Sequence, residues 1–301
     1  MSNDPQTGRL RRLLRLNKTT ICIAVMMLVV VAWNVTVAYI DSKLQHKENQ
    51  DVYASCHKIW AARGLYNSLA EQNSIVSMQR AFEHGAKGAE VDFHYDVKMG
   101  IFIVSHDHPT HDGDGNLVYT KKDGKLLTLQ AFFAAVGDGH WFWLDYKNLD
   151  KLSVTETDDA IKRLSEITQE GDIRERLYIE GSNPLRLSLY TDAGFKTILG
   201  IHPLRDNNPF ASIEMNAYKI AYSFRNITGI AMAYGRVGDP IYGENAEKLF
   251  GSIPIFLFHV PDQQELLYDL MEKPNVRVVL VEKGRSLNRY AINACEHASG
   301  R

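Results

Sequence analysis

The chain has 301 residues, of which 45% are hydrophobic and 23% charged, and it contains three cysteines. This composition excludes collagen-like, disulfide-scaffold and largely disordered proteins, and it predicts a globular core. The formal net charge is −2, from 34 Lys and Arg against 36 Asp and Glu. Because duplex binding needs a basic excess for phosphate contacts, we expect no nucleic-acid partner.

The first 40 residues predict a membrane anchor. Residues 1–18 carry five basic side chains against Asp4 alone, and the next 22 residues, 19–40, carry no charge. A helix of that length reaches roughly 33 Å, enough for the hydrocarbon core of a bilayer. A buried core helix is less consistent with an apolar run that has no polar face. A cleaved signal peptide would have a shorter apolar region, so we predict an uncleaved transmembrane signal anchor over 19–40.

The charge around this segment predicts its orientation. Basic residues before the span exceed those just after it, so the positive-inside rule places residues 1–18 in the cytoplasm and exports the rest. The protein is then single-pass, and in a bacterium its soluble part lies on the periplasmic face of the inner membrane. Polar residues 41–54 predict a stalk, which is followed by a globular domain over residues 55–301. In an oxidising compartment Cys56 and Cys295 either pair or remain two free thiols.

The exported part alternates between strand and helix patterns. Nine strands are predicted, at 59–62, 89–93, 101–105, 141–146, 177–180, 197–201, 229–233, 253–260 and 276–281. Six helical stretches are predicted, at 75–84, 127–136, 155–168, 184–193, 246–250 and 263–271. This alternation indicates a (β/α)₈ TIM barrel, which takes about 250 residues and tolerates one extra strand. An open doubly wound sheet is the alternative, but the Gly-rich phosphate loop that it usually carries is absent.

Acidic side chains occur near the ends of two predicted strands. Glu90 and Asp92 are two positions apart, so both point to one face of their strand, toward the mouth of a barrel. Asp145 and Lys147 repeat this spacing two strands later. Three carboxylates in this arrangement suit a hard divalent cation, and Lys147 adds a positive charge. The alternative is a set of solvated charges, which the apolar residues preceding them disfavour.

A histidine follows the strand predicted at 101–105. His106 could be a hydrogen-bonded structural residue, as strand-end histidines often are. Beside a metal site it becomes a candidate general acid or base, because an imidazole titrates near neutral pH.

The order of these motifs resembles the glycerophosphodiester phosphodiesterase family, within the phospholipase-C-like TIM barrels. The family pattern runs His-Arg-Gly, Pro-Glu-Asn-Thr, Glu-x-Asp, His-Asp, Thr-Leu-x-Glu and Glu-x-Lys. The corresponding residues here are Ala62-Arg63-Gly64, Glu71-Gln72-Asn73-Ser74, Glu90-Val91-Asp92, His106-Asp107, Thr128-Leu129-Gln130-Ala131 and Asp145-Tyr146-Lys147.

The resemblance implies a phosphoric diester hydrolase that acts on glycerophosphodiesters or phospholipid headgroups. It implies a Ca²⁺ or Mg²⁺ ion held by Glu90, Asp92 and Asp145, with the phosphate bound by Arg63 and Lys147. Two histidines would exchange protons with the attacking and leaving oxygens, and His106 is the second of them. Asp145 replaces a family Glu and keeps its charge. The sequence identifies no protein partner.

The chain departs from the family at its first catalytic position, where Ala62 replaces histidine. His94 shares the parity of Glu90 and Asp92, and four more histidines follow predicted strands, each also interpretable as a loop or packing residue: His108, His111, His202 and His259. Alternatively, the histidine was replaced deliberately to disable catalysis, or the chain is a silent barrel that binds phosphodiester headgroups. A phospholipase-D-like enzyme of the same superfamily is a further alternative.

Overall fold

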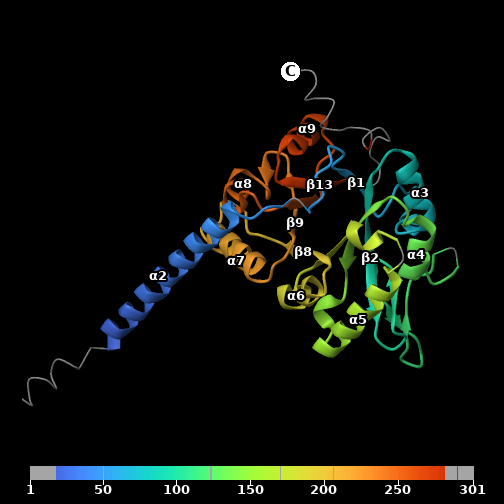
Figure 1. Ribbon diagram of the computed structural model, residues 1–301, viewed down its shortest axis with the longest axis horizontal. Coiled ribbons are helices and arrows are strands. Elements are labelled where there is room, and N and C mark those ends of the chain that lie inside the picture. The colour runs from blue at the N-terminus through green and yellow to red at the C-terminus, as the bar shows by residue number, and fades with distance from the viewer. Residues whose placement is uncertain are drawn as a thin grey trace, which may run out of the picture. The chain divides into compact units, whose positions relative to one another are not determined.

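The computed structural model describes residues 18–49, 51–122, 124–169, 171–205, 207–281 and 290. Its internal contacts divide the chain into two units, Met1–Lys47 and Glu48–Arg301. The described part of the first unit is one long helix. The second unit is a closed barrel (Figure 1).

Eight parallel strands close the barrel, because β1 pairs with both β13 and β2. In order around the barrel they are β1 (Ile59–Ala62), β2 (Gly88–Asp96), β6 (Trp141–Tyr146), β7 (Leu177–Gly181), β8 (Lys196–Ile201), β9 (Gly229–Ala233), β12 (Ile255–Phe258) and β13 (Val276–Val281). The predicted (β/α)₈ barrel is therefore confirmed, and the open sheet is wrong.

One of the nine predicted strands, 101–105, lies outside the closed circle. β3 (Ile101–Val104) pairs antiparallel with the second half of β2, from Phe93↔Val104 to Asp96↔Ile101. The strand predicted at 89–93 therefore continues to Asp96 before the chain turns back. Two short hairpins are added in loops, β4 (Thr110–His111) with β5 (Leu117–Val118), and β10 (Gly235–Arg236) with β11 (Asp239–Pro240).

Helices follow most of the barrel strands. They are α3 (Ile75–Glu83), α4 (Leu129–Val136), α5 (Val154–Ile167), α6 (Pro184–Asp192), α7 (Ala211–Phe224), α8 (Glu244–Phe250) and α9 (Gln264–Glu272), with short 3₁₀ turns at η1 (Leu69–Glu71), η2 (Leu149–Lys151) and η3 (Ile173–Arg176). The sequence predicts six of these seven helices within a few residues, and α7 is the exception.

Alternate residues of the strands fill the barrel interior. Trp60, Trp143, Tyr178 and Phe256 form an aromatic layer with aliphatic residues of the other strands. Tyr53 packs beneath it, with its ring 5.0 Å from that of Trp60 and its backbone N–H donating to the Tyr178 hydroxyl at 2.7 Å. Since the interior is packed here, space for a ligand exists toward the carboxyl ends of the strands.

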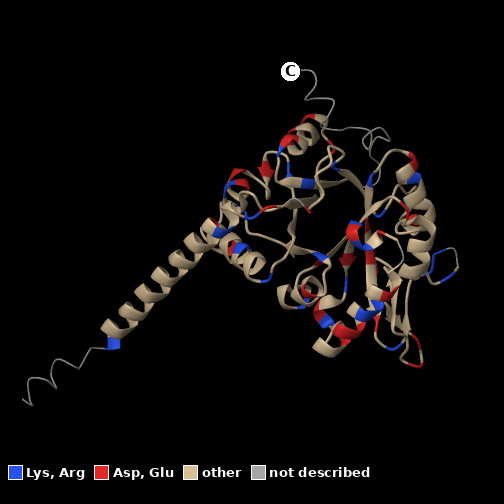
Figure 2. Ribbon diagram, viewed as in Figure 1, with Lys and Arg blue, Asp and Glu red and all other residues tan. Residues whose placement is uncertain are grey.

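The N-terminal helix α2 (Lys18–Gln45) has 28 residues and is long and apolar enough to cross a membrane. In Figure 2 the ribbon of this helix is tan, the colour of uncharged residues, over most of its length. Its polar side chains bond to the helix itself: Asn34 Nδ2 donates to the Val30 carbonyl at 2.7 Å and Thr36 Oγ1 to that of Ala32 at 2.8 Å. Such internal pairing is what a lipid environment requires.

The segment predicted as a stalk, residues 41–54, is described in two places. Residues 41–45 continue α2, while Val52 and Tyr53 belong to the barrel core. Cys295, which the sequence offers either as a partner of Cys56 or as a free thiol, lies outside the described residues.

Candidate active site

The first strand ends in a tight turn that presents Arg63. Arg63 and Gly64 have positive φ angles of 58° and 80°. A Cβ at Gly64 would lie 2.7 Å from the backbone of Ser77, so only glycine allows this turn to pack against α3. The Arg63 carbonyl accepts hydrogen bonds from the Asn73 amide at 3.0 Å and from Ser77 Oγ at 3.2 Å. The guanidinium is thereby held at the barrel mouth.

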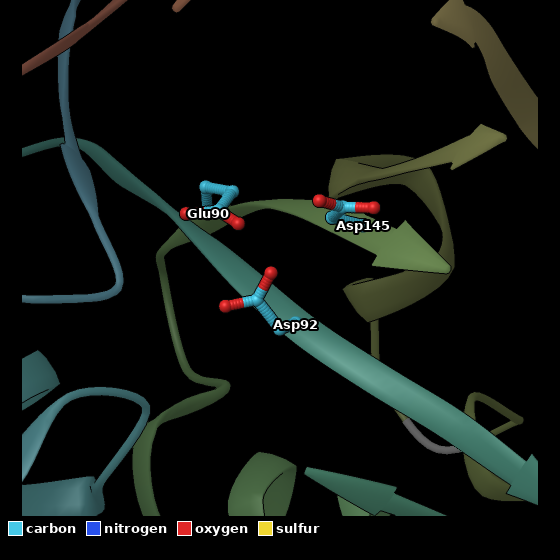
Figure 3. Close-up of side chains that lie close together, drawn as sticks. All are labelled: Glu90, Asp92 and Asp145. Carbon is cyan, nitrogen blue, oxygen red and sulfur yellow. The ribbon is translucent and has the colours of Figure 1, made fainter. Parts of the chain in front are cut away.

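Three carboxylates gather beside this turn. Glu90 and Asp92 project from the same side of β2, and Asp145 projects from the neighbouring strand β6, where it lies opposite Asp92 in the register (Figure 3). One oxygen from each of the three carboxylates lies within 4.8 Å of the others. Strand parity therefore brings them together, as the sequence predicts.

Asn73 fixes the orientation of Asp92. Its Nδ2 donates to Asp92 Oδ2 at 2.7 Å, and its Oδ1 accepts the backbone N–H of Asp92 at 3.1 Å. Asn73 is fully buried and adopts a left-handed φ of 57°, a conformation that asparagine tolerates better than most residues. The paired hydrogen bonds leave the other oxygen of Asp92, Oδ1, in contact with Lys147 Nζ.

Two cations lie against the carboxylates. Lys147 Nζ is 2.5 Å from Asp92 Oδ1 and also contacts Asp145 Oδ2. Arg63 Nε lies 3.7 Å from Asp92 Oδ2 and 3.9 Å from Glu90 Oε2. Both side chains that the sequence offers for phosphate binding are thus brought to the acidic cluster.

Glu180 adds a fourth carboxyl group to the three carboxylates and two cations of the site. Glu180, at the end of β7, accepts a hydrogen bond from Trp143 Nε1 at 2.5 Å. Four carboxyl groups therefore face two permanent cations, a deficit of two positive charges when all four are ionised. The sequence motifs do not include Glu180, although it follows the buried Tyr178 by two positions, as Asp145 follows Trp143.

Burial and crowding affect how these acids titrate. Burial, reinforced by Asp92 and Asp145, holds the pKa of Glu90 well above its usual value. Burial also raises the pKa of Asp145, and burial together with the charge of Asp145 raises the pKa of Glu180 to about 8. Burial opposes ionisation of Asp92 as well, but Lys147, Asn73 and Arg63 keep its pKa below the usual value. The fully ionised cluster would therefore hold more negative charge than its own cations neutralise.

His106 reaches the mouth because β3 runs backwards along β2. The amide of Ser105 donates to the Asp92 carbonyl at 3.0 Å, which places the next residue above the acidic cluster. His106 Nδ1 lies 3.2 Å from Asp107 Oδ1. The predicted proton-transfer histidine thus comes from an excursion outside the barrel and not from a barrel strand.

A cavity of about 440 Å³ opens over all these groups. Its lining includes every site residue predicted from the sequence: Ala62, Arg63, Glu90, Asp92, His106, Asp145 and Lys147. Glu180, His202, Phe258 and His259 line its other side.

His94, considered from parity as a substitute for the missing histidine, is not among the described residues that line this cavity. It is buried, with its ring 5.6 Å from that of His108 and 5.9 Å from that of Tyr119. Burial and the neighbouring His108 lower its pKa to about 4. His94 is therefore a neutral packing residue near neutral pH.

Comparisons with known proteins give a match at the level of structure alone. No protein-family model and no curated protein matches the sequence. A glycerophosphodiester phosphodiesterase from Thermotoga maritima superposes with a TM-score of 0.53 at 20% identity, over 78% of this chain and 96% of that one. Another from Parabacteroides distasonis superposes with a TM-score of 0.52 at 16% identity, over 77% and 93% of the two chains.

The chain shares the fold of the glycerophosphodiester phosphodiesterases. The resemblance carried by its motifs is thus confirmed for the fold. At these identities the assignment of an activity rests on the chain's own site.

Proposed function

We propose that this protein is a membrane-anchored, metal-dependent phosphodiesterase that hydrolyses glycerophosphodiesters or phospholipid headgroup diesters. The observation that carries the proposal is the group of Glu90, Asp92 and Asp145 at the barrel mouth, beside two cations suited to a phosphate. Active sites of TIM barrels lie at this face.

The residues present fit a divalent cation. Their donors are carboxylate oxygens, which Ca²⁺ and Mg²⁺ prefer, and they come from adjacent strands without rearrangement of the backbone. The four carboxyl groups exceed the two cations by two charges, the amount that one divalent ion supplies. Burial raises the pKa of Glu90, and the neighbouring charges of Asp92 and Asp145 raise it further. When bound, such an ion would polarise a phosphoryl oxygen and favour attack at phosphorus.

The other residues have separable roles in this proposal. Arg63 and Lys147 bind the phosphoryl oxygens and stabilise the negative charge that develops there. His106 lies in the same cavity and transfers a proton at the attacking or the leaving oxygen. Asn73 is a positioning residue, which holds Asp92 in place by two hydrogen bonds.

The helix α2 would keep this site at a membrane surface. We propose that residues 1–18 are cytoplasmic and that the barrel is exported, on the basis of the charge asymmetry around the span. Residues 55–301 then form the catalytic domain and residues 41–54 its connection to the anchor.

The test is hydrolysis of glycerophosphocholine by the full chain in detergent, with Ca²⁺, with Mg²⁺ and with EDTA. Metal-dependent release of glycerol phosphate and choline, lost in Asp92→Asn and Asp145→Asn but kept in Asp158→Asn on the exposed side of α5, supports the proposal. Release of phosphocholine instead indicates cleavage on the glycerol side of the phosphate, as in a phospholipase C. Full activity in Asp92→Asn would overturn the metal site.

A second candidate is a barrel that binds headgroups without hydrolysing them. Ala62 favours it, because the side chain lines the cavity at the place of a proton-transfer group and carries no transferable proton. Binding of glycerophosphocholine without turnover, both in the chain and in Ala62→His, would support this candidate.

A further inference from the structure

His259, the residue directly after β12, lines the candidate active-site cavity against the alternation of its strand. Phe256 belongs to the barrel core and Phe258 packs against it, so alternate residues of β12 face inward. By this alternation His259 would face away from the interior. It nevertheless lines the cavity together with His106 and Arg63.

The backbone of His259 explains this orientation. His259 has a left-handed φ of 50°, which breaks the strand alternation directly after Phe258. Of the four non-glycine residues with positive φ in the described chain, Arg63 and Asn73 already belong to the site. Strained backbone that persists beside a cavity often serves function there. The conformation of His259 therefore directs a titratable ring into the site.

Hydrolysis of a phosphodiester needs two proton transfers. A water oxygen forms a bond to phosphorus and loses a proton, while the bond from phosphorus to the leaving oxygen breaks and that oxygen gains a proton. The products are a phosphomonoester and an alcohol. His106 can serve one transfer, and Ala62 can serve neither, so a second group in the cavity is needed.

We propose that His259 is this second proton-transfer residue and replaces the histidine missing at Ala62. One of His106 and His259 accepts the proton of the attacking water, and the other donates a proton to the leaving oxygen. The inference rests on the proposed phosphodiesterase function.

The position of β12 favours His259 over the other histidine of the cavity, His202. In the sheet order only β13 separates β12 from β1, the strand of Ala62. His202 follows β8, which lies four strands from β1 in either direction around the barrel. The ring of Phe258 also lies near both, 6.3 Å from that of His202 and 5.0 Å from that of His259. His259 is therefore nearer than His202 to Ala62 in the order of the strands, on the side of the cavity where the family histidine is missing.

The experiment compares His259→Asn with His202→Asn and His111→Asn in the full chain, with glycerophosphocholine as substrate. Asparagine tolerates a left-handed backbone but transfers no proton. His259→Asn therefore removes the proton transfer and keeps the backbone conformation. We expect kcat of His259→Asn to fall by about 10²- to 10⁴-fold, with KM changed less than about fivefold and one limb of the pH profile lost. His202→Asn keeps both limbs, and His111→Asn, in the exposed hairpin β4–β5, keeps full activity.

Two further measurements keep the inference testable. Ala62→His in the His259→Asn background should restore activity and the lost limb, and thermal unfolding should show that all variants fold. In the unmutated chain, inorganic phosphate should shift the titration of the His259 ring proton observed by NMR. Activity that survives in His259→Asn, or loss of a pH limb in His202→Asn instead, would overturn the inference and leave the phosphodiesterase proposal standing. No hydrolysis by either the chain or Ala62→His would overturn both.

Discussion

Asn73 and Asp92 hold each other by two hydrogen bonds, one from Asn73 Nδ2 to Asp92 Oδ2 and one from the Asp92 amide to Asn73 Oδ1. They lie 19 residues apart, on the turn before α3 and on β2. Because both bonds end on Asn73, the direction of the Asp92 carboxylate depends on a residue that is not itself in the acidic cluster.

This pair predicts that Asn73→Gly weakens the metal site without removing a ligand. Glycine accepts the φ of 57° but makes no side-chain hydrogen bonds, so we expect divalent-cation affinity and kcat/KM to fall about 10- to 100-fold. Isothermal titration with Mg²⁺ and Ca²⁺ measures this. Asn226→Gly, which changes another left-handed asparagine outside the cavity, serves as control and should leave both values unchanged. Equal losses in the two variants would contradict the prediction.

Divalent cations should stabilise the protein. An ion that binds the folded state alone adds about 2.7 kcal/mol to the free energy of unfolding at 100 times its Kd. We therefore expect Mg²⁺ or Ca²⁺ to raise Tm and EDTA to lower it, as measured by differential scanning fluorimetry. In Asp145→Asn the shift should largely disappear, while in Asp158→Asn it should persist. A cation shift that is unchanged in Asp145→Asn would argue against the predicted site.

The raised pKa of Glu180 predicts how stability depends on pH without metal. Its folded pKa of about 8 exceeds that of an unfolded Glu, so between about pH 4.5 and 8 the folded state holds more protons than the unfolded state. The contribution of Glu180 to the free energy of unfolding is therefore fully present at low pH. It is lost as the pH rises to 8, by at most about 1.4 kcal/mol per pH unit.

We expect Tm of the EDTA-treated chain to decline from about pH 6.5 to 8, and Glu180→Gln to decline less steeply. Glutamine still accepts the Trp143 hydrogen bond and has no charge to bury. Glu83→Gln, at an exposed position of α3, should decline like the unmutated chain. Parallel slopes in the unmutated chain and Glu180→Gln would contradict the prediction.

The anchor is tested by a charge at its centre. Val30→Arg places an arginine in the middle of α2, at an insertion cost of about 2.5 to 3.5 kcal/mol. We expect carbonate extraction to release a larger share of Val30→Arg than of the unmutated chain or of Val30→Leu. Retention of all three in the membrane pellet would mean that α2 is not what holds the protein there.

The fold is predictable from the sequence where local pattern and tertiary packing agree. The bounds of β6, β9 and β13 match the expected strands to the residue, and each of these strands pairs with a neighbour on both sides. Helix α7 is not predicted; it begins after Phe210 without a side-chain cap, a feature that it shares with the predicted helices α8 and α9.

The site residues divide in the same way. Glu90, Asp92 and Asp145 could be placed together because strand parity alone determines which way they point. His259 could not be placed with them from the sequence, because its left-handed φ reverses that parity. No pattern in a single sequence predicts such an angle. Asn73 could be matched to a motif, but its hold on Asp92 depends on how the turn packs against β2.

The backward path of β3 means that the residues of the candidate site are held in two different ways. The carboxylates are carried by residues of the paired barrel strands β2 and β6, so the pairing that closes the cylinder also fixes their positions. His106 comes from β3, outside the circle, and His259 from the first residue after a strand. In our proposal, a histidine carried outside the strand pairing takes over from one that is missing within it, at Ala62 of β1, while the barrel and its acidic cluster stay the same.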